Sequence, residues 1–171
     1  LYIDQMDSKT GLLAVKHTNV NQWDSVLVDW PTSEHDGYAF TKSWYNTVMN
    51  AVACGAFEAM SNMAEVLGKT ADHDMYQGYA DTIKQGMINY LYDEEEGAYR
   101  DGLTIDGEPV DHYAQHATAF ALAYGVYDNE EMAKKLAASI EEDGAIKTSV
   151  YGSYFVLSGL YNAGDGDTAM D

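Results

Sequence analysis

The feature that most constrains the fold is a helical pattern broken by connectors that alternate between short and long. From residue 43 to residue 162, apolar side chains recur at steps of three and four residues, as on one face of an α-helix. The short connectors contain Gly68, Gly125 and Gly164, each followed by residues that favour a helix start. The repetition predicts an all-α fold of antiparallel helical hairpins, stacked as a solenoid or closed into a toroid.

The predicted helices fall into pairs. We expect helices over residues 43–67, 70–91, 113–124, 129–140 and 149–162, a sixth beginning near Asp167, and the last turns of an earlier helix at residues 1–7. Residues 92–110 are expected to form a loop with a short hairpin, because glycines interrupt the pattern there. The apolar stripe predicted for the first helix consists of Val48, Val52, Ala56, Ala59, Met63 and Val66.

The long connectors indicate where function resides. They cover residues 11–42, 92–112 and 142–148, and each precedes the first helix of a predicted pair. We therefore expect all three to gather at one end of the helices. Loops held by a rigid scaffold commonly carry binding and catalytic residues.

The charge balance excludes several classes of partner. The chain has 171 residues, with 9 Lys and Arg against 28 Asp and Glu, for a net charge of −19. Such a surface repels phosphate backbones and anionic membranes, so we expect no nucleic-acid or membrane partner, whereas neutral sugars remain open. Cys54 is the single cysteine, which excludes an internal disulfide. No phosphate-binding glycine loop follows a predicted strand, and we expect no cofactor.

The first long loop contains a tryptophan beside a carboxylate, Asp29–Trp30, followed by Glu34 and Asp36. An indole face packs on the apolar face of a sugar, while carboxylates accept hydrogen bonds from its hydroxyls. Alternatively, Trp30 plugs the loop onto the core and Asp29 caps a turn before Pro31.

Two histidines four residues apart, His112 and His116, fall on one face of a predicted helix, a spacing found in zinc sites. The intervening residues lack the glutamate of a metalloprotease motif, and no third ligand is evident, so we predict no metal. Gln115 and His116 are better interpreted as hydrogen-bond donors to a polar ligand at the loop end of a helix. The competing interpretation is a hydrogen-bond network at the helix start.

Several stretches, in order, resemble the catalytic domain of bacterial α-L-rhamnosidases, six-hairpin glycosidases with an (α/α)6 barrel. The similarity covers most of the chain. The stretches are LVDWP at 27–31, DGY at 36–38, the helix at 45–69, EEEGAYRDG at 94–102, QHATAFALAYG at 115–125 and TSVYGSYFVLSGLYNAG at 148–164.

The resemblance implies inverting hydrolysis of terminal α-L-rhamnosyl residues by a general acid and a general base. Trp30 matches a tryptophan that lines the sugar pocket in this family, and Asp29 precedes it in the same way. Substrate contacts are therefore expected from Asp29, Trp30, Asp36, Gln115 and His116. The family's acid-bearing segment lies before the matched part, and its base lies after it. We thus expect residues 1–171 to be one internal piece of a larger catalytic domain, inactive alone.

Other interpretations remain open. Another six-hairpin enzyme would act on a different sugar; a uronate substrate would need more basic residues than Lys16, Lys42, Arg100 and Lys147 beside the long loops. A non-catalytic helical repeat would present a broad concave surface instead of a pocket around Trp30.

As a piece of a barrel, the chain is expected to associate with the rest of its own domain, or with itself through open flanks. Its compartment is not fixed by the sequence, although the cytoplasm of a bacterium is favoured. Were the chain active alone, Asp29, Glu34, Asp36 and Asp101 would be the first carboxylates to test.

Overall fold

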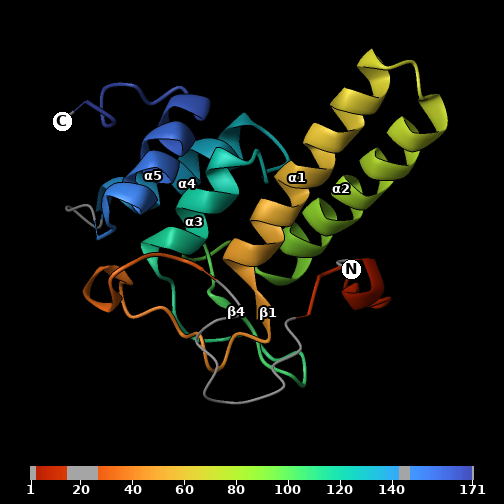
Figure 1. Cartoon of the computed structure of the whole chain (residues 1–171). Helices are drawn as coiled ribbons and strands as arrows, with labels where there is room; N and C mark the ends of the chain where they lie inside the picture. Colours follow the sequence, from red (N-terminus) through yellow and green to blue (C-terminus); the bar gives the residue numbers. More distant parts are fainter. Residues whose placement is uncertain (1–2, 15–26, 143–146, 171) are drawn as a thin grey trace.

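A computed structural model describes residues 3–14, 27–142 and 147–170, and these residues form five α-helices linked by irregular segments (Figure 1). The expected all-α fold of helical hairpins is confirmed. The helices are α1 (Thr47–Val66), α2 (Thr70–Tyr90), α3 (Gln115–Ala123), α4 (Glu130–Glu142) and α5 (Val150–Asn162). None of the described helices combines the length and apolar character needed to cross a membrane.

The helices are arranged around α3, which packs against α1 on one side and against α5 on the other, with α4 also in contact (Figure 1). Helices α1 and α2 form a long antiparallel hairpin closed by the short turn at Gly68, whose φ of 68° suits glycine. In the core, the ring of Phe120 from α3 stacks on Phe155 from α5, with centroids 3.8 Å apart. These contacts align the starts of α1, α3 and α5 at one end.

The long connector between α2 and α3 contains the expected hairpin. Strand β2 (Tyr92–Asp93) pairs antiparallel with β3 (Ala98–Tyr99). Strand β4 (Gly102–Leu103) pairs with β1 (Tyr45–Asn46), the segment that leads into α1. The second pairing was not predicted, and it holds two long connectors together at what we call the loop end of the molecule.

Single turns of 3-10 helix occur at Ile3–Gln5 and Thr32–Glu34. Of the helix predicted over residues 1–7, the described residues contain only the single turn at Ile3–Gln5. The sixth predicted helix is wrong for the described residues 165–170, which form turns. There the Ala169 N–H makes a long, helix-like bond of 3.4 Å to the Asp165 carbonyl. The Met170 N–H bonds the carbonyl of Asp167 instead of continuing that pattern, and the N–H of Thr168 bonds the Asp165 side chain.

The apolar stripe predicted for α1 is also wrong beyond its first turn. Val48 is buried, but Met63 and Val66 are 58% and 86% exposed. The buried stripe is the adjacent one, with Ala51, Cys54, Phe57, Ser61 and Ala64 facing the protein interior. Both stripes have helical spacing, and α2 packs on the one that contains Cys54, Phe57 and Ser61.

Candidate substrate-binding site at the loop end

The described parts of the long connectors meet at the loop end, as predicted, and the carboxylate of Asp29 joins them. Its Oδ2 accepts hydrogen bonds from His116 Nε2 and from the backbone N–H of Ser149, both at 2.8 Å. Its Oδ1 accepts from the Trp30 N–H at 2.7 Å and from the Ser149 hydroxyl. One side chain therefore fixes the Trp30 segment to the starts of α3 and α5.

Asp29 is ionised at neutral pH despite its burial. Its side chain and that of His116 are both fully buried. Burial raises the pKa of the Asp29 carboxyl, but hydrogen bonds from Ser149, His116 and Trp30 outweigh this effect and lower the pKa below its ordinary value. A carboxylate only accepts, so His116 must donate through Nε2. Its Nδ1 is buried and has no hydrogen-bond partner among the described residues.

Gly152 in the first turn of α5 makes this arrangement possible. A Cβ at this position would lie 2.4 Å from Asp29 Oδ2 and 2.7 Å from Thr148 Cβ, closer than van der Waals contact allows. Ser149 caps the same turn, because its Oγ accepts from the N–H groups of Tyr151 and Gly152. The close approach of Asp29 to α5 thus depends on the absence of a side chain at residue 152.

Trp30 follows this buried anchor and is 74% exposed. The alternative that it plugs the loop onto the core is therefore wrong. The loop is further held by His35, whose Nε2 donates to the Asp29 carbonyl at 2.7 Å. The backbone on which Trp30 stands is tethered on both sides, while its indole faces solvent. This is the arrangement expected of an aromatic surface that receives a ligand.

Asp36 and Gln115 join the same loops in a second cluster. The Gln115 N–H donates to Asp36 Oδ2 at 2.9 Å, and Gln115 Oε1 accepts from the Lys147 N–H at 3.0 Å. The Lys147 ammonium lies 3.5 Å from Asp36 Oδ1. Gln115 is buried, whereas Asp36 is partly exposed. Glu34 lies one residue before His35 in the 3-10 turn and is hydrogen-bonded by Ser33.

A second buried carboxylate, Asp101, lies beneath the loops. It accepts from the backbone N–H groups of Ala39 at 2.6 Å and Ala114 at 2.8 Å, and from His112 Nδ1 at 2.8 Å. Burial raises the pKa of Asp101, although these hydrogen bonds oppose the rise. His112 and His116 thus contact different carboxylates and do not converge. Within the described residues no group of three His, Cys, Asp or Glu side chains is placed to hold a metal ion.

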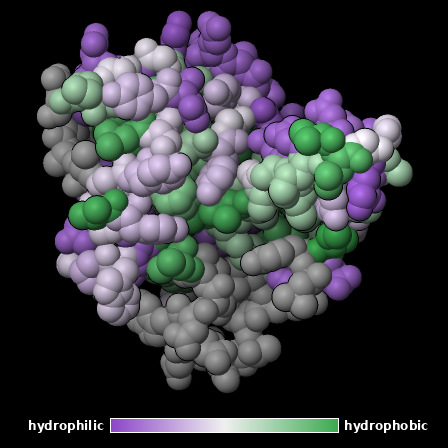
Figure 2. Space-filling view, turned by 45° about the horizontal axis from the view of Figure 1, so that its top comes forward, coloured by the Kyte–Doolittle hydropathy of each residue, from purple (hydrophilic) through white to green (hydrophobic). Residues whose placement is uncertain are grey.

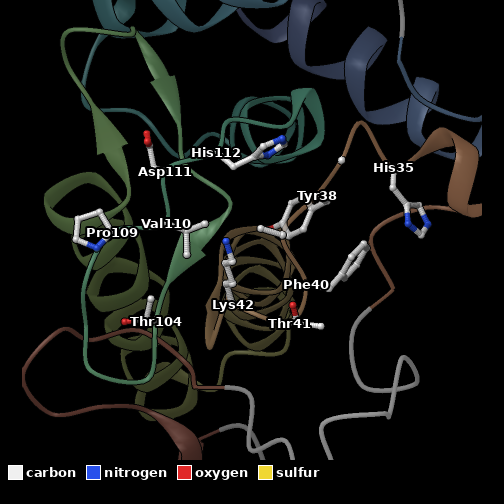
Figure 3. Close-up of a pocket in the computed structure, with 12 residues that line it drawn as sticks. His35, Tyr38, Phe40, Thr41, Lys42, Thr104, Pro109, Val110, Asp111 and His112 are labelled. Carbon is white, nitrogen blue, oxygen red and sulfur yellow. The ribbon is translucent and has the colours of Figure 1, made fainter.

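Beside Asp101 lies a cavity of about 620 Å³, here called the loop-end pocket (Figure 3). It opens between the segment at 35–42 and the connector at 104–112. His112 borders one side of it, and His35 and Phe40 lie on the other (Figure 3). The lining residues are His35, Gly37, Tyr38, Ala39, Phe40, Thr41, Lys42, Thr104, Pro109, Val110, Asp111 and His112.

Sequence analysis missed three parts of this site: Ser149 and Gly152 as partners of Asp29, and Asp101 as a structural carboxylate. The serine and glycine stand in a segment, SVYGS, that resembles an ordinary capped helix start. Their proximity to residue 29 depends on tertiary contacts across 120 residues. Asp101 was considered only as a candidate catalytic acid.

The helical hairpins, with their long connectors gathered at one end, define an all-α class of stacked helical hairpins, and comparison with known proteins specifies the family. The model of the bacterial alpha-L-rhamnosidase 6 hairpin glycosidase domain family matches residues 2–171. The chain belongs to this family. No curated protein matches the sequence significantly.

Two solved structures have similar folds. A GH78 family rhamnosidase of Bacillus sp. GL1 superposes with a TM-score of 0.74 at 24% identity, over 99% of this chain and 17% of that one. A rhamnosidase from Klebsiella oxytoca, solved with rhamnose bound, gives a TM-score of 0.71 at 13% identity, over 98% of this chain and 28% of that one. The chain therefore spans less than a third of the length of each of these two proteins.

Proposed function

We propose that this chain is part of the catalytic domain of a glycoside hydrolase that removes terminal α-L-rhamnosyl residues, and that Trp30 contacts the sugar. The observation that carries this proposal is an exposed indole on a backbone that the buried Asp29 fixes to the starts of α3 and α5. A rigid aromatic surface binds the apolar face of a pyranose at little cost in conformational entropy. The rhamnose bound to the Klebsiella protein of similar fold agrees with this substrate class.

The buried residues of the site have a positioning role in this proposal. Asp29 and His116 are buried and bonded to one another, so they act on the sugar through the Trp30 segment. Asp36 and Gln115 are bonded to one another and hold the later part of the same loop against the start of α3. The Asp36 side chain is partly exposed, so its carboxylate can accept a hydrogen bond from a sugar hydroxyl. A neutral sugar suits a chain of net charge −19, which would repel an anionic substrate.

We place the general acid and base elsewhere in the catalytic domain. Inversion needs two carboxyl groups about 6.5–9.5 Å apart that reach the glycosidic bond and a water molecule. Asp29 and Asp101 are buried, and their oxygens are occupied by several hydrogen bonds each. The small share of the two rhamnosidases that this chain covers supports a domain with further segments.

The exposed apolar faces agree with such neighbours. Val66 on α1 is 86% exposed, and Val150 and Tyr154 on α5 are 93% and 66% exposed. On the face shown in Figure 2, hydrophobic side chains gather in patches between hydrophilic ones. We propose that the free sides of α1 and α5 pack against further helices of the same domain, and self-association through these faces is the alternative.

The test is Trp30→Ala in the protein that carries this chain, assayed on an aryl α-L-rhamnoside. We expect kcat/KM to fall about tenfold or more, the equivalent of about 1.4 kcal/mol of lost transition-state binding. Ile105→Ala, which removes an exposed apolar side chain from another loop, is the control and should change little. Hydrolysis of a uronate glycoside in preference to the rhamnoside would overturn the substrate assignment.

A further inference from the structure

The loop-end pocket has the size and the lining of a site for a sugar ring. Its volume of about 620 Å³ falls within the usual range for small-molecule pockets. Phe40, Pro109 and Val110 provide apolar surface, while hydroxyl, ammonium, imidazole and carboxylate groups lie around it. Lys42 and Asp111 carry opposite charges, so the pocket offers no excess of charge to an ionic ligand. Its chemistry fits a neutral ring with hydroxyl groups.

Both walls of the pocket are fixed to one buried group. Asp101 accepts from the Ala39 N–H on one wall and from His112 on the other, and its own carbonyl accepts from the Tyr38 hydroxyl at 2.6 Å. The Asp101 side chain is fully buried. The cavity is therefore held open by hydrogen bonds formed before any ligand arrives, which lowers the entropy cost of binding.

His112 is oriented to act on a ligand hydroxyl. Because Nδ1 donates to the Asp101 carboxylate, the neutral imidazole carries its lone pair on Nε2. Nε2 lies against Gly37, where an added Cβ would come within 3.1 Å of it. Gly37 has φ of 69°, so glycine both suits the backbone and leaves the space beside Nε2 clear.

The pocket also adjoins the Trp30 segment. His35 forms part of the pocket wall, and its Nε2 bonds the carbonyl of Asp29, the residue before Trp30. The pocket wall and the Trp30 segment are therefore joined by a hydrogen bond within the same loop.

From this geometry we infer that the loop-end pocket binds the neutral sugar to which the terminal rhamnose is linked, with His112 Nε2 accepting a hydroxyl of that second ring. This inference rests on the proposed function. It assigns to His112 and Lys42 the selection of the leaving sugar, and to Asp101 the orientation of His112.

The experiment compares two substrates in the protein that carries this chain. One is α-L-rhamnosyl fluoride, whose leaving group is too small to reach the pocket, and the other is a disaccharide of rhamnose linked to glucose. We expect His112→Ala to lower the ratio of kcat/KM for the disaccharide over the fluoride about three- to tenfold, as for one lost hydrogen bond. His112→Gln, which retains an acceptor, should restore part of that ratio.

Further variants protect the result from a folding artefact. Lys42 is exposed and only lines the pocket, so Lys42→Ala should fold normally and lower the ratio in the same direction. Asp106→Asn, on the exposed turn outside the pocket, should leave the ratio unchanged. An unchanged ratio in both folded pocket variants would overturn the inference. Inactivity of the unmodified protein on both substrates would instead overturn the proposed function, and this inference with it.

Discussion

Replacing Gly152 with alanine tests whether the contact between Asp29 and α5 holds the site together. In an open helix this change stabilises, because alanine is favoured over glycine by about 1 kcal/mol. Here the new Cβ would lie 2.4 Å from Asp29 Oδ2 and 2.7 Å from Thr148 Cβ. The carboxylate must move, although its position is fixed by His116 and Ser149.

The expected loss of unfolding free energy in Gly152→Ala follows from these contacts. Overpacking a buried position costs about 1–3 kcal/mol. Displacing the carboxylate also sacrifices a charge-assisted hydrogen bond, worth about 1.5–3 kcal/mol. After the gain in helix propensity, we expect Gly152→Ala to lower the free energy of unfolding by about 3 kcal/mol. The kcat/KM for a rhamnoside should fall as well, because the Trp30 segment loses its anchor.

The assay is urea unfolding followed by far-ultraviolet circular dichroism, with Gly78→Ala as the matched control. Gly78 lies in α2 with nothing within 4 Å of an added Cβ, so this variant should be more stable by about 0.5–1 kcal/mol. If Gly152→Ala is stabilised as much as the control, the loop yields without cost, and Asp29 cannot be the anchor described above.

Three further predictions concern buried groups. The pKa of Asp29 is lowered in the folded state, so its ionised form stabilises the fold above its ordinary pKa of about 4, and this stabilisation is lost as the pH falls through the lowered value. Asp29→Asn should therefore flatten the decline in unfolding free energy below about pH 4, measured by urea titration at several pH values; a decline as steep as in the unmodified protein would contradict this. Burial raises the pKa of Cys54 to about 12, so the thiol should react with iodoacetamide at neutral pH only after the protein unfolds. Rapid labelling of the native protein would contradict this prediction and would show that α1 and α2 separate readily. Tyr99→Phe removes the buried hydrogen bond from its hydroxyl to the Val126 carbonyl and should cost about 1–3 kcal/mol of unfolding free energy, whereas Tyr90→Phe, at a more exposed hydroxyl, should cost much less.

The helices and the gathering of the long connectors could be predicted because both follow from local signals. Apolar spacing marks the helices, and glycines such as Gly68 and Gly125 end them. The buried face of α1 could not be predicted in this way. Ala51 and Val52 stand on adjacent stripes with the same period, and the choice between them depends on the shape of α2.

At the site, the sequence indicated the tryptophan as a candidate ligand surface, which stays a prediction, and it could not assign the role of its neighbours. Asp29 resembles any loop carboxylate until Ser149 and His116 are brought against it. His112 and His116 share a helical spacing, yet His112 stands before the first residue of α3 and turns to Asp101. Burial decides whether such polar groups face a ligand or one another, and burial is set by contacts far apart in the chain.

The partners of Asp29 also set the order in which this site becomes competent. The hydrogen bonds that orient the Trp30 segment reach across 87 residues to His116 and 120 residues to Ser149. Contacts of such long sequence separation form late, whereas the α1–α2 hairpin closes through local contacts. During synthesis, the tryptophan leaves the ribosome long before the serine that fixes its loop. A nascent chain that ends before α5 would therefore carry the α1–α2 hairpin and an exposed indole, but the loop beneath that indole would lack its anchor at Ser149.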